Sequence, residues 1–173
     1  PVAPLNLVAD SGGGSMLVLV GIVTALYERE RSGQGQVIDA AMVDGVSMLS
    51  QMAWTMKATG VLRDERESWL LDGGAPFYRT YETADGKYMA VGSIEPQFFA
   101  QLLAGLGLAA DEVPNQFELG AYDRMRAIFT ARFATRTRDE WTAVFAGTDA
   151  CVTPVLTWAE AAANEHLLAR QTL

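Results

Sequence analysis

The sequence has few of the residues from which metal sites and disulfides are built. Its 173 residues include one cysteine, Cys151, and one histidine, His166. One cysteine cannot form a disulfide within the chain, so a reducing setting inside the cell is expected, and without a Cys/His cluster a zinc or iron site is not. Cys151 lies in an apolar segment, which favours a buried small side chain over a nucleophile. His166 stands in a predicted terminal helix, and we expect it at the surface.

Basic residues and long apolar runs are also scarce. The 13 Lys and Arg against 21 Asp and Glu give a net charge of −8 at pH 7, which argues against a nucleic-acid partner and against an anionic membrane surface. The apolar run 16–26 is shorter than the about 20 residues of a membrane helix, and it lacks the flanks of a signal peptide. Half of the residues are hydrophobic, enough for a folded core. We therefore expect a cytoplasmic protein, and the start at Pro1 without methionine predicts a piece of a longer chain.

The first residues are predicted to be extended and then helical. Pro1 and Pro4 predict an extended segment over 1–10. Ser15 is the expected N-cap of an apolar helix that ends near Arg31. Two glycines follow this helix, Gly33 and Gly35, and they suit the left-handed geometry that ends helices.

The segment after these glycines, Gly33 and Gly35, is predicted to alternate between strand and helix. A Val-Ile pair predicts a short buried strand over 36–41, and apolar residues at steps of three and four predict a helix over 42–59. The most hydrophilic run of the sequence follows, and it marks a linker or crossover at 60–76.

The remainder is predicted to form a compact α+β unit. Its predicted strands are 77–83 and 87–93, joined by a hairpin turn at 84–86, and a third strand over 151–156. One predicted helix is opened by Pro96 and closed by Gly105 or Gly107, and another covers 122–134, with its core face at Met125, Ile128, Phe129 and Phe133. Capping boxes at Thr137 and Glu140, and at Thr157 and Glu160, predict the starts of two more helices.

The first candidate for chemistry is Asp10, because three glycines follow it at 12–14, ahead of the predicted helix. A helix N-terminus presents free backbone N–H groups, and glycines leave them unobstructed. Such a corner could hold a developing oxyanion while the carboxylate exchanges a proton. The spacing is that of neither a P-loop nor GxGxxG. The structural alternative, which the pattern alone favours, is that Asp10 caps a turn and the glycines allow close helix packing.

Two further candidates lie in the second half of the chain. Glu95 stands where a predicted strand meets the helix opened by Pro96, and α/β proteins place sites at the carboxyl ends of strands. The segment 71–78, LDGGAPFY, allows a close backbone approach at its glycines and ends at the phenol of Tyr78. A solvated N-cap glutamate and a plain linker turn are the structural alternatives.

Four segments together resemble the family III CoA-transferases of the CaiB/BaiF type, over essentially the whole chain. They are PLNLVADSGGG, RERSGQGQVIDAAMVDG, LLDGGAPFYRTYETADGKYMAVGSIEPQFF and GTDACVTPVLT. Within the family, the resemblance is to members that racemise 2-methylacyl-CoA thioesters by 1,1-proton transfer, without a metal or organic cofactor. It implies an isomerase of lipid and fatty-acid metabolism.

The resemblance also implies the fold. It is an α/β fold in which a Rossmann-like large domain and a small α+β domain are joined by linkers, and two chains interlock as a homodimer. On that map, 1–50 belongs to the large, CoA-binding domain, 51–76 is a linker, 77–160 is the small domain and 161–173 starts the return linker. The implied ligand is an acyl-CoA thioester.

The resemblance implies roles for single residues as well. Asp10 matches one of two catalytic bases, and Glu95 matches the glutamate of the IEPQF motif, which supports a catalytic histidine from the partner subunit. That histidine lies upstream of these residues in the family, and His166 does not match it. The predicted substrate-binding residues are Asn6, Gly12, Gly13, Gly14 and Tyr78.

Two alternatives stay open. In a CoA-transferase of the same family, Asp10 would be the nucleophile that carries a covalent anhydride; the family's transferases lack the IEPQF glutamate, so Glu95 favours racemisation. The other alternative is a dimerisation and substrate-lining fragment. Because the histidine and most of the CoA-binding half are absent, we expect no turnover from these 173 residues alone.

Overall fold

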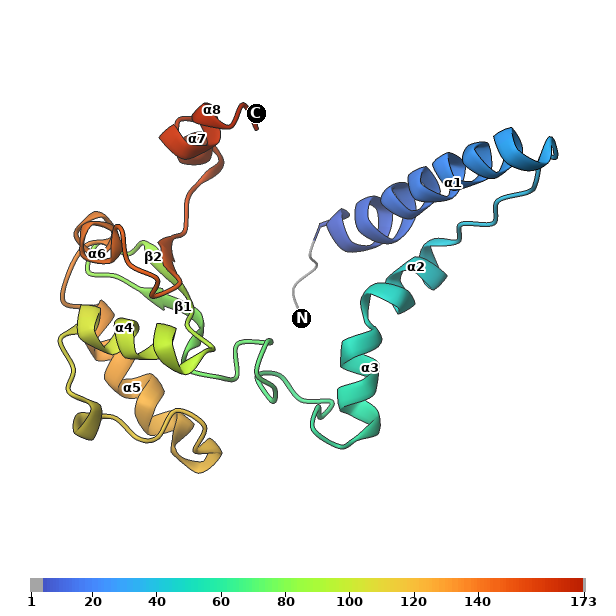
Figure 1. Cartoon of the computed structure of the whole chain (residues 1–173). Coiled ribbons are helices and arrows are strands. Elements are labelled where there is room, and N and C mark those ends of the chain that lie inside the picture. Colours follow the sequence, from blue (N-terminus) through green and yellow to red (C-terminus); the bar gives the residue numbers. More distant parts are fainter. Residues whose placement is uncertain (1–4, 173) are drawn as a thin grey trace. The chain divides into compact units, whose positions relative to one another are not determined.

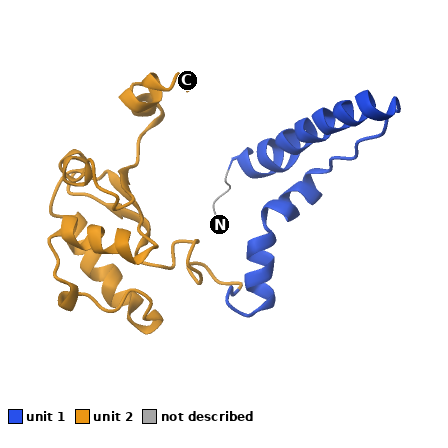
Figure 2. Cartoon of the chain, in the orientation of Figure 1, with its two compact units in different colours: residues 1–63 blue, residues 64–173 orange. Residues whose placement is uncertain are grey.

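The computed structural model describes residues 5–172 (Figure 1). The chain divides into two compact units, residues 1–63 and 64–173 (Figure 2). The described part of the first unit is built of helices, and the second combines helices with a three-stranded sheet. The division of the chain into a large domain, linkers and a small domain stays a prediction.

The first unit begins with a π-helix, η1 (Leu7–Met16), which continues directly into α1 (Leu17–Ser32). The extended segment predicted over 1–10 is therefore wrong for 7–10, and residues 1–4 lie outside the described residues. Proline restricts only itself and the residue before it, so its influence does not reach the residues after Leu5.

The start of the long helix differs from the prediction, but its end does not. Ser15 lies inside the helix instead of capping it, and its hydroxyl donates to the Asp10 carbonyl at 2.9 Å. Gly33 follows α1 with φ +74°, the left-handed conformation that was expected there.

Together, η1 and α1 form one helix, Leu7–Ser32, that is long and apolar enough to cross a membrane by length and composition. It is longer than the apolar run 16–26 because the helix starts earlier than predicted. Only 6% of its most apolar window is buried, so this helix exposes many large apolar side chains. A core helix of a larger globular protein has the same composition.

The strand predicted over 36–41 is wrong. Residues 34–41 have no regular secondary structure, and Val37 is 94% exposed. Among the described residues, no strand pairs with this segment. A strand requires a neighbour for its N–H and C=O groups, and an apolar pattern does not reveal whether that neighbour is present.

The helix predicted over 42–59 is confirmed with one interruption. It consists of α2 (Met42–Leu49) and α3 (Gln51–Ala58), separated at Ser50, where φ is −93° and ψ is 8°. Apolar residues at helical spacing continue through this position, so the pattern does not register a one-residue break.

Two glycines determine how closely η1 and α2 approach each other. Gly13 and Gly45 are both buried. A Cβ on Gly13 would lie 2.9 Å from the backbone nitrogen of Val46, and a Cβ on Gly45 would overlap the Gly13 carbonyl. The two backbones can be this close because neither residue has a side chain.

The second unit contains an antiparallel sheet. Its strands, in spatial order, are β1 (Tyr78–Glu82), β2 (Tyr88–Gly92) and β3 (Val152–Pro154). These strands confirm the three predicted ones. Tyr81 pairs with Met89 across β1 and β2, and Met89 pairs with Pro154 across β2 and β3. The β1–β2 hairpin turn contains Gly86 at φ +71°, as the turn signal predicts.

Helices pack against the sheet face that carries Tyr81 and Met89. They are α4 (Pro96–Leu106), α5 (Tyr122–Phe133) and α6 (Arg138–Phe145), with the short 3-10 turns η2 (Ala110–Glu112) and η3 (Leu119–Ala121) between α4 and α5. Gly107, and not Gly105, ends α4, with φ +65°. On α5, the predicted core residues Met125, Phe129 and Phe133 are buried.

Aromatic rings fill the core between the sheet and the helices. Phe133 stacks on Tyr81 with 5.0 Å between ring centroids and meets Trp141 edge-on at 5.3 Å. Trp141 is 2% exposed and donates its indole N–H to the Phe133 carbonyl at 2.9 Å. Rings of this size contribute about 1.5–3 kcal/mol each when fully buried, so this cluster is a main source of the unit's stability.

Both predicted capping boxes are present. Thr137 and Glu140 cap α6, and Thr157 and Glu160 cap α7 (Trp158–Ala162), which α8 (Glu165–Ala169) follows. In each box the threonine accepts from the third helical amide and the glutamate reaches back to the threonine amide. These caps explain why both helices begin where the sequence predicts.

Glu160 has a second partner that a capping box does not require. The Arg138 guanidinium, on a residue that is 6% exposed, forms a two-point pair with the Glu160 carboxylate at 2.7 and 2.8 Å. Arg138 also donates to the Val155 carbonyl at 3.0 Å. The Arg138 hydrogen bonds hold the pKa of Glu160 well below its usual range. The pair therefore links α7 to α6 and to the chain after β3.

We expect the substitution Gly45→Ala to destabilise the protein. The new Cβ overlaps the Gly13 carbonyl, so η1 and α2 must move apart, and overpacking of this kind costs about 1–3 kcal/mol. Thermal unfolding of the full-length protein measures the effect as a lower Tm. Gly35→Ala is the control, because its Cβ meets nothing within 4 Å. Equal Tm values for the two variants would contradict the close packing of these helices.

We expect the Arg138–Glu160 pair to make folding sensitive to acid. The folded-state pKa of Glu160 is lowered, so the pair contributes stability above the ordinary glutamate pKa of about 4.3 and loses it as the pH falls below that value. Glu160→Gln keeps the capping geometry but removes the charge, so its unfolding free energy should fall less steeply with acid than that of the wild type. Glu112→Gln is the control, because the Glu112 carboxylate accepts the Ala109 N–H at 2.7 Å and pairs with no arginine of the described residues. Parallel pH profiles for wild type and Glu160→Gln would refute this expectation.

Candidate functional site

Asp10 lies in the first turn of η1 and is exposed. Its carboxylate makes no hydrogen bond or ion pair with any residue that the structure describes; only its carbonyl is bonded, by Ser15. The first hydrogen bond of η1 runs from the Ser11 N–H to the Asn6 carbonyl at 3.1 Å. The amides of residues 7–10 therefore have no partner within the helix. The Asp10 carboxylate thus stands in the first turn of η1, whose amides have no acceptor inside the helix itself.

The predicted role of the glycine amides requires a correction. Gly12, Gly13 and Gly14 lie inside η1, after its first hydrogen-bonded turn, so their amides are not the free ones of a helix N-terminus. The glycines instead allow α2 to approach: a Cβ on Gly14 would lie 3.0 Å from Met42 Cγ. The packing interpretation of this motif therefore describes its local structure. The assignment of these glycines to substrate binding stays a prediction.

Asn6 is the N-cap of η1 and is exposed. Its side chain makes no capping hydrogen bond, whereas its carbonyl accepts the first bond of the helix. Residues four apart on a helix lie on the same side, so Asn6 and Asp10 lie on one side of the first turn of η1. This is an arrangement in which both side chains are available to a ligand.

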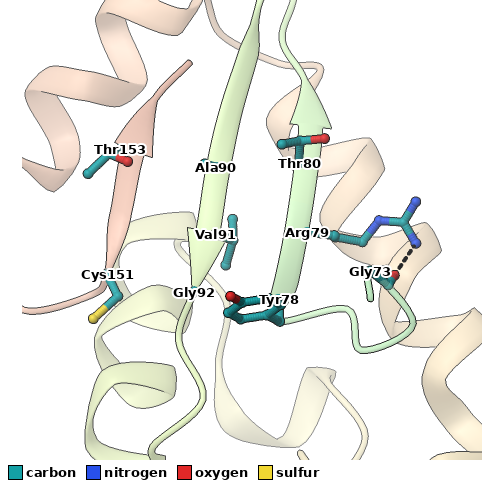
Figure 3. Close-up of a pocket in the computed structure, with 9 residues that line it drawn as sticks. All are labelled: Gly73, Tyr78, Arg79, Thr80, Ala90, Val91, Gly92, Cys151 and Thr153. Atoms are coloured by element: carbon teal, nitrogen blue, oxygen red, sulfur yellow. Dashed lines mark hydrogen bonds between the residues drawn. The ribbon is translucent and has the colours of Figure 1, made fainter. Parts of the chain in front are cut away.

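In the second unit, the sheet face opposite the helices contains a hollow of about 430 Å³ (Figure 3). Its lining comes from all three strands and from the loop before β1: Gly73, Tyr78, Arg79, Thr80, Ala90, Val91, Gly92, Cys151 and Thr153. The central strand contributes Ala90 and Gly92 to this face, opposite Thr80 and Tyr78. The hollow forms because β2, the central strand, has only Ala90 and Gly92 on this face, whereas β1 has the larger side chains of Tyr78 and Thr80.

Tyr78 stands at one end of the hollow, at the start of β1. Figure 3 shows its ring beside Gly92, and a Cβ on Gly92 would lie 4.0 Å from a carbon of that ring. Tyr78 thus lies at a concave surface of the sheet, and its role in substrate binding stays a prediction.

The DGG segment before Tyr78 is a tightly bonded turn. The Asp72 carboxylate accepts the N–H groups of Ser68, Trp69 and Gly74 at 2.9, 3.1 and 3.0 Å. Gly73 has φ +90°, which favours glycine. A Cβ on Gly74 would lie within 2.6 Å of two carbonyl oxygens. Both glycines are thus required by the turn itself, as the structural alternative supposed, and the turn delivers the chain to Tyr78.

Arg79 fastens this turn to the sheet. Its guanidinium donates to the Gly73 carbonyl at 3.2 Å and lies 3.4 Å from a Glu67 carboxylate oxygen. In Figure 3 its side chain extends from β1 toward Gly73. The positive charge of Arg79 is therefore engaged with the turn and is partly neutralised by Glu67.

Glu95 follows β2 and is the N-cap of α4, as predicted. It is exposed, and its carboxylate neither caps the helix nor bonds to another residue in the described part of the chain. Its negative charge contributes to raising the pKa of Cys151, so Glu95 lies near the end of the hollow at which Cys151 and Tyr78 stand.

Cys151 is the residue that sequence reasoning missed. It was expected to be buried within a strand, but it is exposed and has φ +54°, just before β3 begins. Desolvation raises the pKa of its thiol, and the negative charges of Glu95 and Asp149 add to this effect. The thiol thus stays protonated at neutral pH, which disfavours a nucleophilic role. An apolar neighbourhood in sequence does not reveal a left-handed residue, so no signal could have placed it here.

The histidine was placed correctly. His166 lies in α8 and is exposed, as expected. Within residues 5–172, no group of three or more His, Cys, Asp or Glu side chains could hold a metal ion. The described part of the chain thus offers two exposed carboxylates, Asp10 and Glu95, and an open hollow beside Tyr78 as its candidate sites.

Known proteins resemble the chain over nearly its whole length. It is 53% identical to alpha-methylacyl-CoA racemase of Mus musculus and 51% identical to that of Homo sapiens, each over 96% of this chain and 44% of the relative. The chain thus spans less than half the length of these curated relatives. A solved CaiB/BaiF family protein from Brucella suis superposes with a TM-score of 0.71 at 24% identity, over 98% of this chain and 45% of that one.

The solved structure confirms the predicted fold class, a mixed helix and sheet fold shared with CaiB/BaiF proteins. The family model described as CoA-transferase family III matches residues 1–173. The chain therefore belongs to CoA-transferase family III.

Proposed function

We propose that this protein is an isomerase that racemises 2-methylacyl-CoA thioesters. The observation that carries the proposal is the identity of 53% and 51% to two alpha-methylacyl-CoA racemases over 96% of the chain. The exposed, unpartnered carboxylates of Asp10 and Glu95 support it, because a group that moves a proton must be reachable by its substrate or by a second catalytic group. We assign this reaction to the whole protein, because these 173 residues match only 44% of the length of each racemase.

The chemistry requires a base and a stabilised enolate. The hydrogen at C2 of a thioester is weakly acidic, so its removal becomes feasible only if the enolate oxygen is stabilised where it forms. Asp10 removes or returns this proton. In this proposal, backbone amides in the same first turn of η1 donate to the enolate oxygen. Loss of one such donor typically lowers the rate by about 10²–10³.

Inversion at C2 requires a second base on the opposite face of the enolate. By resemblance, this base is a histidine of the partner subunit in a homodimer, and Glu95 supports it. The unbonded carboxylate of Glu95 at the N-cap of α4 is free to accept a hydrogen bond from such an imidazole. His166 does not take this role, so we infer that the 173 residues alone are inactive. The proposed reaction needs no metal and no organic cofactor.

CoA transfer is the second candidate function, because the family includes transferases. In that reaction, the Asp10 carboxylate would attack the thioester carbonyl and form an anhydride as CoA leaves. The exposure of Asp10 suits either role. Glu95 favours racemisation, since a nucleophilic aspartate needs no second base.

The experiment is the substitution Asp10→Asn in the full-length protein. We expect it to lower the incorporation of deuterium from D₂O at C2 of a 2-methylacyl-CoA by about 10²–10⁴, the usual contribution of a general base. Mass spectrometry or NMR measures the exchange. Asp111→Asn, which changes an exposed aspartate on η2, is the control and should exchange at the wild-type rate.

Two results would contradict the proposal in different ways. Full exchange by Asp10→Asn would refute the role of Asp10. Transfer of CoA to a carboxylic acid by the wild type, without exchange at C2, would replace racemisation by the transferase reaction.

A further inference from the structure

Ser93 occupies the point at which the ends of three strands meet. It follows β2 directly and is completely buried. Its N–H donates to the Phe77 carbonyl, just before β1, at 2.9 Å, and its hydroxyl donates to the Ala150 carbonyl, ahead of β3. One residue thus joins the end of the central strand to both of its neighbours.

Gln116 reaches the same point from another part of the chain. It lies between η2 and η3 and is 7% exposed. Its amide nitrogen donates to the carbonyls of Ser93 and Ile94 at 3.2 and 2.7 Å. The side-chain amide of Gln116 thus donates to two successive carbonyls of the segment that connects β2 to α4.

These two carbonyls immediately precede Glu95, whose carboxylate has no hydrogen bond of its own among the described residues. On its other side, the Glu95 carbonyl accepts the N–H groups of Phe98 and Phe99 at 3.0 and 2.9 Å. Hydrogen bonds therefore hold the main chain on both sides of Glu95, which places the base of its side chain. Gln116 and Ser93 hold the first of these two sides.

We propose that Gln116 and Ser93 are positioning residues that hold Glu95 in the geometry required for proton transfer. This inference rests on the proposed function, in which Glu95 supports the second catalytic base. Buried polar side chains are kept where their hydrogen bonds are satisfied, and here those bonds converge on the segment that carries a free carboxylate. A displacement of about 1 Å at a catalytic group can lower a rate by about 10², so these bonds affect turnover as well as folding.

The variant Gln116→Met in the full-length protein tests the proposal. It keeps the length of the side chain and removes both donors. We expect kcat for racemisation of a 2-methylacyl-CoA to fall about tenfold to a hundredfold, with KM changed less than about threefold, because Glu95 acts on the chemical step and not on binding. In the Glu95→Gln background, Gln116→Met should cause no further fall, since coupled residues do not act additively.

The control is Trp141→Phe. It also removes a buried hydrogen bond from a side chain to a main-chain carbonyl, that of Phe133, but it lies in the aromatic core. We expect a lower Tm and an unchanged kcat. If Gln116→Met fails to fold, Ser93→Ala, which removes a single hydroxyl, takes its place with the same expectations.

The outcomes separate this inference from the proposed function. A wild-type kcat in the positioning variant, or an equal fall in the wild-type and Glu95→Gln backgrounds, overturns the positioning role while leaving racemisation intact. A wild-type kcat in Glu95→Gln refutes the role of Glu95, and the positioning inference falls with it.

Discussion

The candidate site of the second unit depends on the hydrogen bonds that converge on Ser93. A three-stranded sheet this small has few ladder bonds, and β3 comprises only Val152–Pro154. The hydroxyl of Ser93 extends the pairing beyond the end of the strands, because it reaches the Ala150 carbonyl that precedes Cys151. The same bonds bring Tyr78, Cys151 and Glu95 to one end of the sheet. A buried serine and a buried glutamine thus connect the packing of the fold to the residues of the candidate site.

The carboxylates of Asp10 and Glu95 differ from those of two other acidic residues, Glu160 and Asp72, in having no partner among the described residues. Glu160 and Asp72 are engaged, the first with Arg138 and the second with three backbone amides. Asp10 and Glu95 are exposed and bonded to no described residue through their carboxylates. A carboxylate that only stabilises a helix or a turn has partners in its own unit. An exposed carboxylate without a partner is available for a substrate or a second subunit, and the proposed function selects Asp10 and Glu95 among the exposed carboxylates of the chain.

How much of this could be predicted from the sequence depended on whether the signal was local. The capping box at Thr157 and Glu160 and the glycine that ends α4 were recognisable because they involve neighbouring residues only. The strand over 36–41 failed because pairing requires a distant segment. The glycines 12–14 were predicted at a helix N-terminus, whereas in the structure they lie inside η1 and face α2, with Gly13 against Gly45. Such tertiary contacts override local patterns, and the positions of Cys151 and Gln116 depend on them entirely.

We propose that the whole protein moves a proton at C2 of its substrate between the two opposite faces of an enolate. The most direct measurement follows the configuration and the isotope together, in a single turnover of the full-length protein with one enantiomer of a 2-methylacyl-CoA in D₂O. We predict that the product of inverted configuration carries one solvent deuterium at C2, because one base removes the proton and a different base delivers its replacement. Inverted product that retains its original hydrogen, or unchanged configuration accompanied by CoA transfer, would contradict this mechanism.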